Sequence, residues 1–170
     1  AMINDLPKIA IRFVALILLQ VLVLNNVAFS GSINPYLYIL FILMLPFDSP
    51  KWLPLVSAFF LGLSIDVFTS TLGMHAAASL FMAYSRNYLL KLFAPRDGYD
   101  PILSPTIQDM GLVWFLAYSS ILTFLHHAFL FTIELFRFTE FFPTLGRALL
   151  SSIFTIILIL ISQLLIYRKK

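Results

Sequence analysis

The sequence has no cysteine and few charged residues. Without cysteine the chain has no disulfide and no thiolate that could bind a metal ion. Asp, Glu, Lys and Arg make up 11% of the 170 residues, against about 25% in a typical soluble domain. Not one charged residue occurs between Phe13 and Phe47. Because 61% of the residues are hydrophobic, most of the surface must face lipid, and we predict an all-α integral membrane protein with no sizeable soluble domain.

Several functional signatures are missing as well. The net charge of +3 comes from loop lysines and arginines, and no basic run is interleaved with aromatic residues as nucleic-acid binding requires. There is no nucleophile beside a base, no phosphate-binding loop, no HExxH motif and no Cys/His cluster. We therefore predict a protein that is not an enzyme and has no cofactor, metal ion or nucleic-acid partner. The first apolar segment is interpreted as an anchor, not a cleaved signal peptide, because no soluble domain follows it.

The apolar runs predict six transmembrane helices, each needing about 20 residues to cross a bilayer. The second helix is short, and the fifth is longer than a bilayer requires, beginning at Ser104–Pro105. The six helices are expected near Ile9–Ala28, Asn34–Pro46, Leu53–Thr69, Gly73–Phe93, Ser104–Phe136 and Leu145–Tyr167.

The positions of lysine and arginine predict the orientation of these helices. With the N-terminus inside, the outer loops hold only Arg137 and Arg147, and all the other basic residues lie on the inner side. Cytoplasmic loops are the ones enriched in Lys and Arg, so both termini are predicted to be cytoplasmic. The inner set is Lys8, Arg12, Lys51, Arg86, Lys91, Arg96, Arg168, Lys169 and Lys170.

The third and fourth predicted helices form a hairpin that contains buried polar groups. Small residues recur every four positions, and the link "STLG" (70–73) is short, so we expect close antiparallel packing with the turn at the outer surface. Asp66 and His75 would meet across this hairpin, since a carboxylate that accepts hydrogen bonds is less costly to bury. We favour a structural latch for Asp66; a ligand or partner contact and a proton relay are the alternatives. The residues of this packing motif are Ala58, Gly62, Asp66, Ser70, Gly73, His75, Ser79 and Ala83.

A second polar group lies on the fifth predicted helix. His126 and His127 are adjacent and point about 100° apart on a helix, so both cannot bind one metal ion. A row of polar residues ends at Glu134 and would line an outward-facing cavity with Asp66 and His75. Interhelical hydrogen bonds are the favoured interpretation of this row, and a groove for a partner or ligand is the alternative.

The segment that follows is rich in phenylalanine and carries charges at three-residue steps. We predict an amphipathic helix at the outer interface, which anchors the chain or docks a partner. The candidate residues of this surface and of the polar row are Ser119, Thr123, His127, Glu134, Arg137 and Glu140.

The stretch "GLSIDVFTSTLGMHAAASLFMAYSR" resembles the signature of the MreD family, the rod shape-determining membrane proteins of bacteria. The match consists of a Gly-x-x-x-Asp element, a short turn, Leu-Gly and a helix of small residues. The opening "RFVALILLQVLVLNNVAFSGSINPYLYILFILMLP" resembles one branch of the family, as do "YDPILSPTIQDMGLVWFLAYSSILTFLHH" and "LFTIELFRF…LGRALLS". The resemblance covers nearly the whole chain, and its motif positions are Gly62, Asp66, Leu72, Gly73 and 76–78.

The resemblance implies a scaffold of the bacterial inner membrane. Members of this family have MreC as a close partner and belong to the elongation machinery that includes MreB, RodA and a class B penicillin-binding protein. It also implies a fold similar to the substrate-binding components of energy-coupling-factor vitamin transporters. The alternative function is therefore a membrane substrate-binding component for a vitamin or lipid, with Asp66, His75, His127 and Glu134 around its pocket. A packed centre would count against this alternative.

Overall fold

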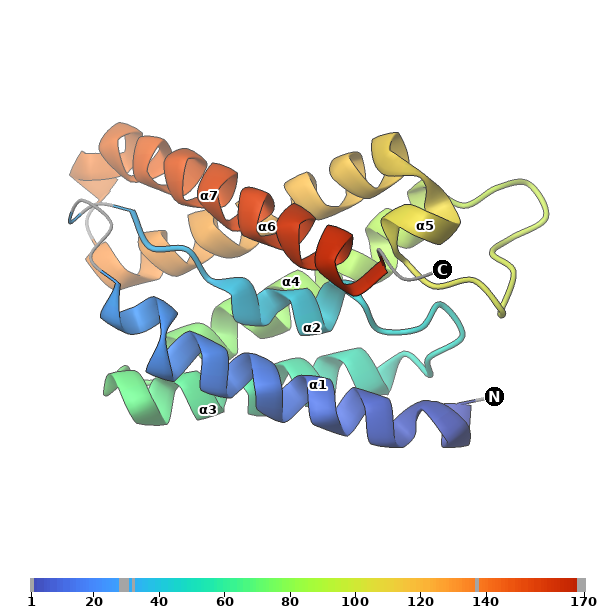
Figure 1. Cartoon of the computed structure of the whole chain (residues 1–170). Helices are drawn as coiled ribbons and strands as arrows, with labels where there is room; N and C mark the ends of the chain where they lie inside the picture. The colour runs from blue at the N-terminus through green and yellow to red at the C-terminus, as the bar shows by residue number, and fades with distance from the viewer. Residues whose placement is uncertain (1, 28–30, 32, 137, 168–170) are drawn as a thin grey trace.

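Helices account for the regular structure of the chain, and no strand occurs within the residues that the computed structural model describes, 2–27, 31, 33–136 and 138–167. The elements, with η for 3-10 turns, are α1 (Met2–Leu22), η1 (Leu24–Asn26), η2 (Leu37–Ile39), α2 (Leu40–Leu43), α3 (Trp52–Thr69), α4 (Met74–Leu92), α5 (Ile107–Met110), α6 (Leu112–Leu135), η3 (Phe138–Glu140) and α7 (Phe141–Tyr167) (Figure 1).

Successive segments run back and forth between two ends of the molecule (Figure 1). The α3–α4 and α6–α7 connections lie together at one end, which we call the hairpin end. The start of α1 and the end of α7 lie at the opposite, terminal end, with the loops before α3 and before α5. Adjacent helices in the chain are therefore antiparallel neighbours, as in helical bundles with short connections.

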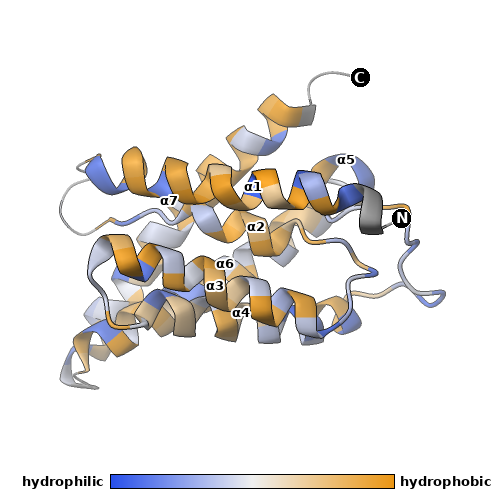
Figure 2. Ribbon diagram, turned by 90° about the horizontal axis from the view of Figure 1, so that it is seen from below, coloured by the Kyte–Doolittle hydropathy of each residue, from blue (hydrophilic) through white to orange (hydrophobic). Residues whose placement is uncertain are grey.

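Among the described residues, four helical stretches are long and apolar enough to cross a membrane, which indicates a membrane protein: Asp5–Asn26, Trp52–Thr69, Leu112–Leu135 and Phe141–Ile166. Hydrophobic residues run along these helices, and hydrophilic residues lie mainly near the ends and in the loops (Figure 2). Helix α4 is 19 residues long but less apolar, since it contains Arg86 and Lys91. The predicted third and fourth helices agree with α3 and α4 to within one residue at each end.

The second predicted helix, 34–46, is wrong over much of its length. Residues 33–36 are extended, and only 37–43 are helical. Pro35 disfavours the helical conformation at Asn34 and itself lacks an N–H. The backbone polar groups of this stretch are instead bonded by side chains of α1 and α7, which the next subsection describes.

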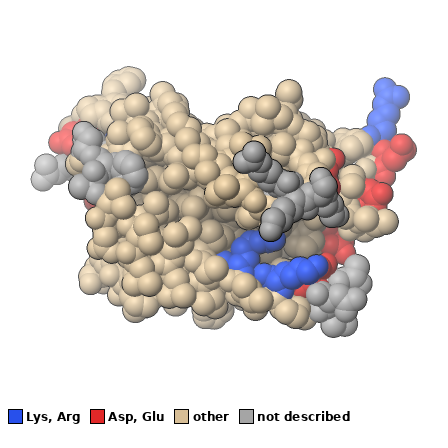
Figure 3. All heavy atoms as spheres, in the orientation of Figure 1, with Lys and Arg blue, Asp and Glu red and all other residues tan. Residues whose placement is uncertain are grey.

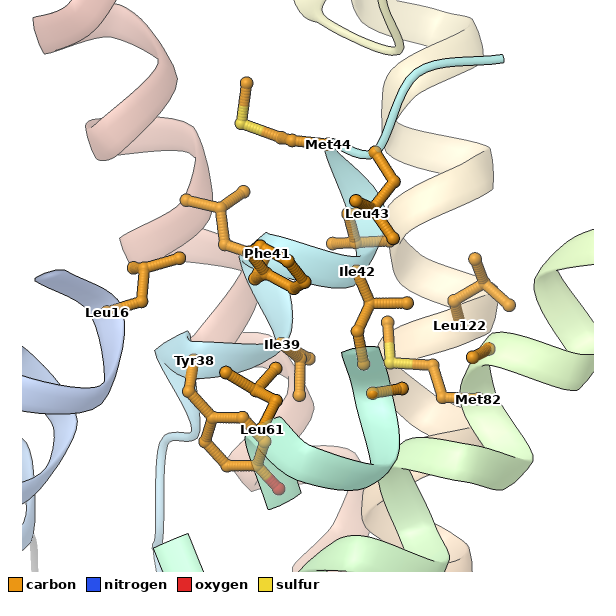
Figure 4. Close-up of a cluster of buried hydrophobic side chains, with 14 of the residues drawn as sticks. Leu16, Tyr38, Ile39, Phe41, Ile42, Leu43, Met44, Leu61, Met82 and Leu122 are labelled. Atoms are coloured by element: carbon orange, nitrogen blue, oxygen red, sulfur yellow. The ribbon is translucent and has the colours of Figure 1, made fainter. Parts of the chain in front are cut away.

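This short segment fills the centre of the bundle. Every residue from Leu37 to Leu45 is at most 5% exposed. Tyr38, Ile39 and Ile42 point between side chains from α1, α3, α4 and α6 (Figure 4). An irregular backbone is tolerated at membrane depth only when protein surrounds it, and this one is surrounded. The centre of the molecule is consequently packed, not hollow.

The fifth predicted helix, 104–136, is two helices. Gly111, with φ of +83°, separates α5 from α6. The residue that caps α5 is Thr106, whose hydroxyl accepts from the Asp109 N–H at 3.2 Å, and not Ser104. Ser104 lies outside the helix, and its N–H donates to the Asp109 carboxylate at 2.8 Å. The predicted first helix also differs, since α1 begins at Met2 and ends at Leu22.

The predicted amphipathic helix after Glu134 is interrupted at Phe136. This residue adopts a left-handed conformation (φ +47°) and ends α6. A 3-10 turn containing Glu140 follows, and α7 begins at Phe141, before the predicted Leu145. The interruption reverses the chain at the hairpin end, so the three charges do not form one helical row. Arg137 lies outside the described residues.

Candidate functional site

Asp66 connects the end of α3 to the start of α4. Its Oδ1 accepts from the backbone N–H of His75 at 3.0 Å, and its Oδ2 accepts from that of Ala76 at 2.9 Å. These are unpaired N–H groups of the first turn of α4, which normally receive bonds from a capping side chain. Gly73, the N-cap residue, has no side chain to offer. Asp66 therefore caps a helix from nine residues upstream, and its negative charge lies at the positive end of the α4 dipole.

Two further side chains complete the bonding of this carboxylate. His75 Nδ1 donates to Oδ1 at 3.1 Å, and the Thr71 hydroxyl donates to the same oxygen. Asp66 is 3% exposed. The predicted contact between Asp66 and His75 is thus present in the structure, and both carboxylate oxygens accept hydrogen bonds within the hairpin.

Gly62 provides the room that this cap requires. A Cβ at position 62 would lie 2.4 Å from the His75 carbonyl oxygen and 2.5 Å from the Ala76 Cα. The first turn of α4 therefore rests directly on the α3 backbone, one helical turn before Asp66. Gly73 enters α4 with φ of +82°, a conformation that suits glycine. The Gly-x-x-x-Asp…Gly spacing has a single physical explanation, a close helix crossing capped by a carboxylate.

The other small residues of the hairpin lie inside the fold, apart from Ser70. Ala58, Ser79 and Ala83 are fully buried, so they are not accessible from outside the folded chain. Ser70 is exposed and ends α3 in a left-handed conformation with φ of +56°. Ser79 Oγ donates to Tyr38 Oη at 3.5 Å, so its bond is to the central segment and not to α3. We conclude that the buried members of this row make contacts within the same chain.

The extended segment is held in place by side chains of both neighbouring helices. The backbone N–H groups of Asn34 and Tyr36 donate to Ser151 Oγ and Thr155 Oγ1 of α7, each at 3.1 Å. On the other side Gln20 of α1 donates to the Pro35 carbonyl at 3.2 Å. Ser151 and Thr155 are one turn apart, which matches the spacing of alternate N–H groups in an extended chain.

All three histidines of the chain gather around this segment, in a cluster with two tyrosines. The Tyr36 ring centroid lies 5.2 Å from that of His75 and 5.4 Å from that of His127. Tyr38 Oη and His126 Nε2 are 2.8 Å apart. The three histidines do not form a group that could hold a metal ion. This aromatic–histidine cluster is Tyr36, Tyr38, His75, His126 and His127.

His127 of α6, a predicted site residue, makes one contact within its own helix and one with α7. His127 Nδ1 lies 2.9 Å from the Thr123 carbonyl oxygen, which can only accept, so Nδ1 carries a proton. Its Nε2 lies 3.1 Å from Thr155 Oγ1 of α7. Ser119 donates to the Phe115 carbonyl within its own helix. Thr123 Oγ1 is buried with no partner among the described residues.

A polar pocket of about 400 Å³ opens at the hairpin end. Its wall includes His75, Glu134 and Tyr36, together with asparagines 25, 26 and 34. Asp66 and His127 do not line it, so the predicted cavity of four ionisable residues is only half realised. His75 Nε2 is buried and has no hydrogen-bond partner in the part of the chain that the structure describes.

The remaining charges of the predicted outer surface are paired or exposed. Glu134 is exposed and forms an ion pair of 3.3 Å with Arg147 of α7. The Arg147 guanidinium also lies 4.2 Å from the centre of the Phe131 ring, a cation–π arrangement. Glu140 is exposed, and its backbone carbonyl accepts from Thr144 at 2.7 Å. Exposed aromatic residues follow, with Phe142 at 82% exposure.

A second polar centre near the terminal end was not singled out from the sequence. Arg86 of α4 is 2% exposed, and it donates to Tyr118 Oη at 2.8 Å and to the Leu45 carbonyl. Tyr118 donates to the Leu43 carbonyl at 2.9 Å. The last carbonyl of α2 thus accepts from a phenol, and the Leu45 carbonyl two residues further on accepts from a buried cation. A signal was present, since Arg86 is an ionisable residue inside a predicted membrane helix.

Comparisons with protein-family models, with curated proteins and with solved structures return no match. The function must therefore be inferred from the geometry above and from the residues themselves.

Proposed function

We propose that this chain is a non-enzymatic membrane scaffold of the MreD type, acting in the bacterial cell elongation machinery. It would reside in the inner membrane and bind an MreC-like protein, and through it contribute to rod shape and lateral peptidoglycan synthesis beside MreB, RodA and a class B penicillin-binding protein. The observation that carries the proposal is the hairpin. The residues that resemble the family signature, Gly62, Asp66 and Gly73, form one structural unit in which each has a physical role.

A scaffold also agrees with how the polar residues are used. Asp66 caps a helix, His127 bonds a neighbouring helix, and Arg86 bonds the Leu45 carbonyl after α2. Each of these groups stabilises a contact within the chain. Polar side chains that are bonded within the chain suit a protein whose role is structural.

The proposed topology has six crossings with both termini cytoplasmic. Helix α4 lies antiparallel to α3 across a turn of four residues, which supports a crossing by α4 beside that of α3. Its lower hydropathy is compatible with a crossing, because eight of its residues are buried against other helices and not exposed to lipid. The segment 33–45 would be the sixth crossing, shielded from lipid by α1, α3 and α7.

We place the partner on the aromatic surface that begins α7 at the hairpin end, since the small-residue row is buried. This aromatic surface includes Phe141 and Phe142, 46% and 82% exposed. Aromatic residues are enriched where proteins bind one another. An MreC-like protein would bring a transmembrane helix and a membrane-proximal segment to this end.

The test is affinity capture of the tagged chain from native membranes, with bound proteins identified by mass spectrometry. We expect an MreC-like protein in the eluate, and we expect F141A/F142A to reduce its recovery several-fold. The matched control is L149A/L150A, which truncates two neighbouring exposed leucines about two turns further along α7, 54% and 49% exposed. A wild-type eluate without any MreC-like protein or peptidoglycan synthase would overturn the proposal.

The packed centre counts against the second candidate function, a membrane substrate-binding component for a vitamin or lipid, and one observation away from the centre favours it. The pocket at the hairpin end, about 400 Å³, falls in the range of about 300–1,000 Å³ typical of small-molecule sites. Its polar wall fits a hydrophilic solute better than a lipid tail. Mass spectrometry of the purified protein would support this function if a solute is retained and is lost in H75A. A sample without any retained solute, unchanged in melting across candidate vitamins, would exclude it.

A further inference from the structure

A groove runs along one side of the molecule between α1 and α7. Its volume is about 420 Å³. One face of α1 between Lys8 and Leu19 forms one wall, and Ser162 and Ile166 of α7 form the other. Leu37, Leu40 and Met44 form the floor. Eleven helical steps along α1 correspond to a length of about 17 Å. Apart from Ser162, its polar side chains lie at one end.

The polar end of this groove is basic. Lys8 and Arg12 are one helical turn apart on α1, so both side chains share a face. Figure 3 shows basic side chains gathered at a hollow near the start of α1. Arg12 is half-buried and makes one bond of 3.3 Å, to the Met44 carbonyl. A guanidinium has five N–H donors, so most of the Arg12 donors are not used by that bond.

The acidic residue nearest this end does not cancel its charge. Asp5 lies 3.4 Å from Lys8, but both side chains are well exposed, 42% and 76%. Exposed pairs of this kind bind each other weakly. Asp5 and Ser104 border a smaller adjoining hollow that also contains Lys8 and Arg12. Two cations against one carboxylate leave a positive end on an otherwise apolar groove.

We propose that this groove binds one anionic phospholipid. Its phosphate would lie between Lys8 and Arg12, and an acyl chain would follow the apolar wall past Ala15 and Leu19 over Leu40. The assignment follows from complementarity, because a lipid also has charge at one end and an apolar remainder. Basic pockets between membrane helices bind anionic headgroups in this way. This proposal does not depend on the scaffold function or on its partner.

The lipid class is tested by native mass spectrometry of the whole purified chain, exchanged into nanodiscs that contain equal amounts of phosphatidylglycerol and phosphatidylcholine. We expect wild-type protein to retain one phosphatidylglycerol molecule preferentially. K8Q/R12Q should reduce that retention at least fivefold. A matched control is K51Q/R96Q, which removes two exposed basic residues of the terminal end that do not line the groove.

The apolar part of the groove is tested by a second pair of variants. Ala15 lines the groove and Val14, 54% exposed, does not. We expect A15F to fill the groove and lower retention of both the charged and the uncharged lipid, and V14F to leave both unchanged. Melting of wild-type protein should rise with phosphatidylglycerol and not with inorganic phosphate.

Four outcomes would overturn the proposal. They are equal retention of the two lipids, equal loss in K8Q/R12Q and K51Q/R96Q, retention unaffected by A15F, and stabilisation by inorganic phosphate alone. A photocrosslinker at position 15 that captures a protein helix in native membranes, and no lipid, would assign the groove to a partner instead. If K8Q/R12Q loses lipid but still captures an MreC-like protein, the lipid site stands apart from the scaffold function.

Discussion

Asp66 stabilises the structure mainly through the backbone of α4, and only secondarily through His75. We therefore expect D66L to destabilise the protein more than H75L. D66L removes the acceptor of two backbone N–H groups, at about 1–3 kcal/mol for each donor left buried without a partner. H75L removes the side-chain contacts of Nδ1 with Asp66 and with the Thr71 hydroxyl but strands no backbone N–H; a side-chain bond is worth about 0.5–1.5 kcal/mol. Melting of both single variants and the double variant in the same detergent checks the order.

The double variant separates coupling from simple addition. In D66L the His75 side chain has already lost its carboxylate partner. The melting temperature of D66L/H75L should therefore be close to that of D66L. Larger destabilisation by H75L, or fully additive losses, would show that the carboxylate does not act as the helix cap described here.

At Gly62 the helices α3 and α4 approach so closely that no methyl group fits between them. G62A places a Cβ within 2.6 Å of three backbone atoms of α4, and those atoms cannot rotate away as a side chain would. We expect a loss of about 1–3 kcal/mol, the usual cost of overpacking. The matched control is G146A on α7, where a Cβ meets nothing within 4 Å and alanine favours the helix by up to about 1 kcal/mol. Equal melting of the two variants would contradict the close crossing.

At the scale of elements, the extended segment depends on α7 for its backbone bonds. S151A and T155V remove the acceptors of the Asn34 and Tyr36 N–H groups. We expect each to cost about 1 kcal/mol and to speed hydrogen exchange at amides 34 and 36. S152A is the control, because Ser152 donates only to the Ala148 carbonyl of its own helix at 2.6 Å. Unchanged exchange at those two amides, or an equal effect of S152A, would show that the hydroxyls do not hold the segment.

This segment also marks the limit of what the sequence could predict. α3 and α4 follow from local information, since apolar length and four-residue spacing of small residues determine them. The path of 33–36 depends on Ser151 and Thr155, 117 and 119 positions from the N–H groups that they accept. Pro35 showed where the segment begins but not that it is extended. Likewise, Gly111 could be read as a helical glycine until its positive φ was known.

The candidate site was predictable where two residues were close in sequence. Asp66 and His75 are joined by a short turn, so their contact could be expected. The aromatic–histidine cluster could not, because Tyr36 and Tyr38 lie in an apolar run and only the path of that run brings them to His126 and His127. Arg86 was identifiable as a charge inside a membrane helix, but its partners, Tyr118 and the Leu45 carbonyl, were not.

At the scale of the whole molecule, the number of crossings decides which surfaces meet which compartment. The proposed six crossings put Leu72 outside and Lys51 inside. If only the four long apolar helices crossed, with the N-terminus inside in both cases, Leu72 would be inside and Lys51 outside. Both side chains are exposed, Leu72 at 98%, so either can react with a probe. The absence of native cysteine makes single-cysteine labelling free of background.

We therefore predict that, in intact spheroplasts, a membrane-impermeant maleimide labels L72C and leaves K51C unlabelled until the membrane is opened. T139C is the matched control, since Thr139 is exposed at the hairpin end and lies outside in both arrangements. The opposite pattern, K51C labelled and L72C protected, would mean that α4 and the segment 33–45 do not cross. In that case α3 and α4 could not both lie within the bilayer side by side, and the capped hairpin would have to sit at its inner face. Labelling thus tests, in one experiment, whether α4 crosses the membrane beside the helix α3 against which it packs.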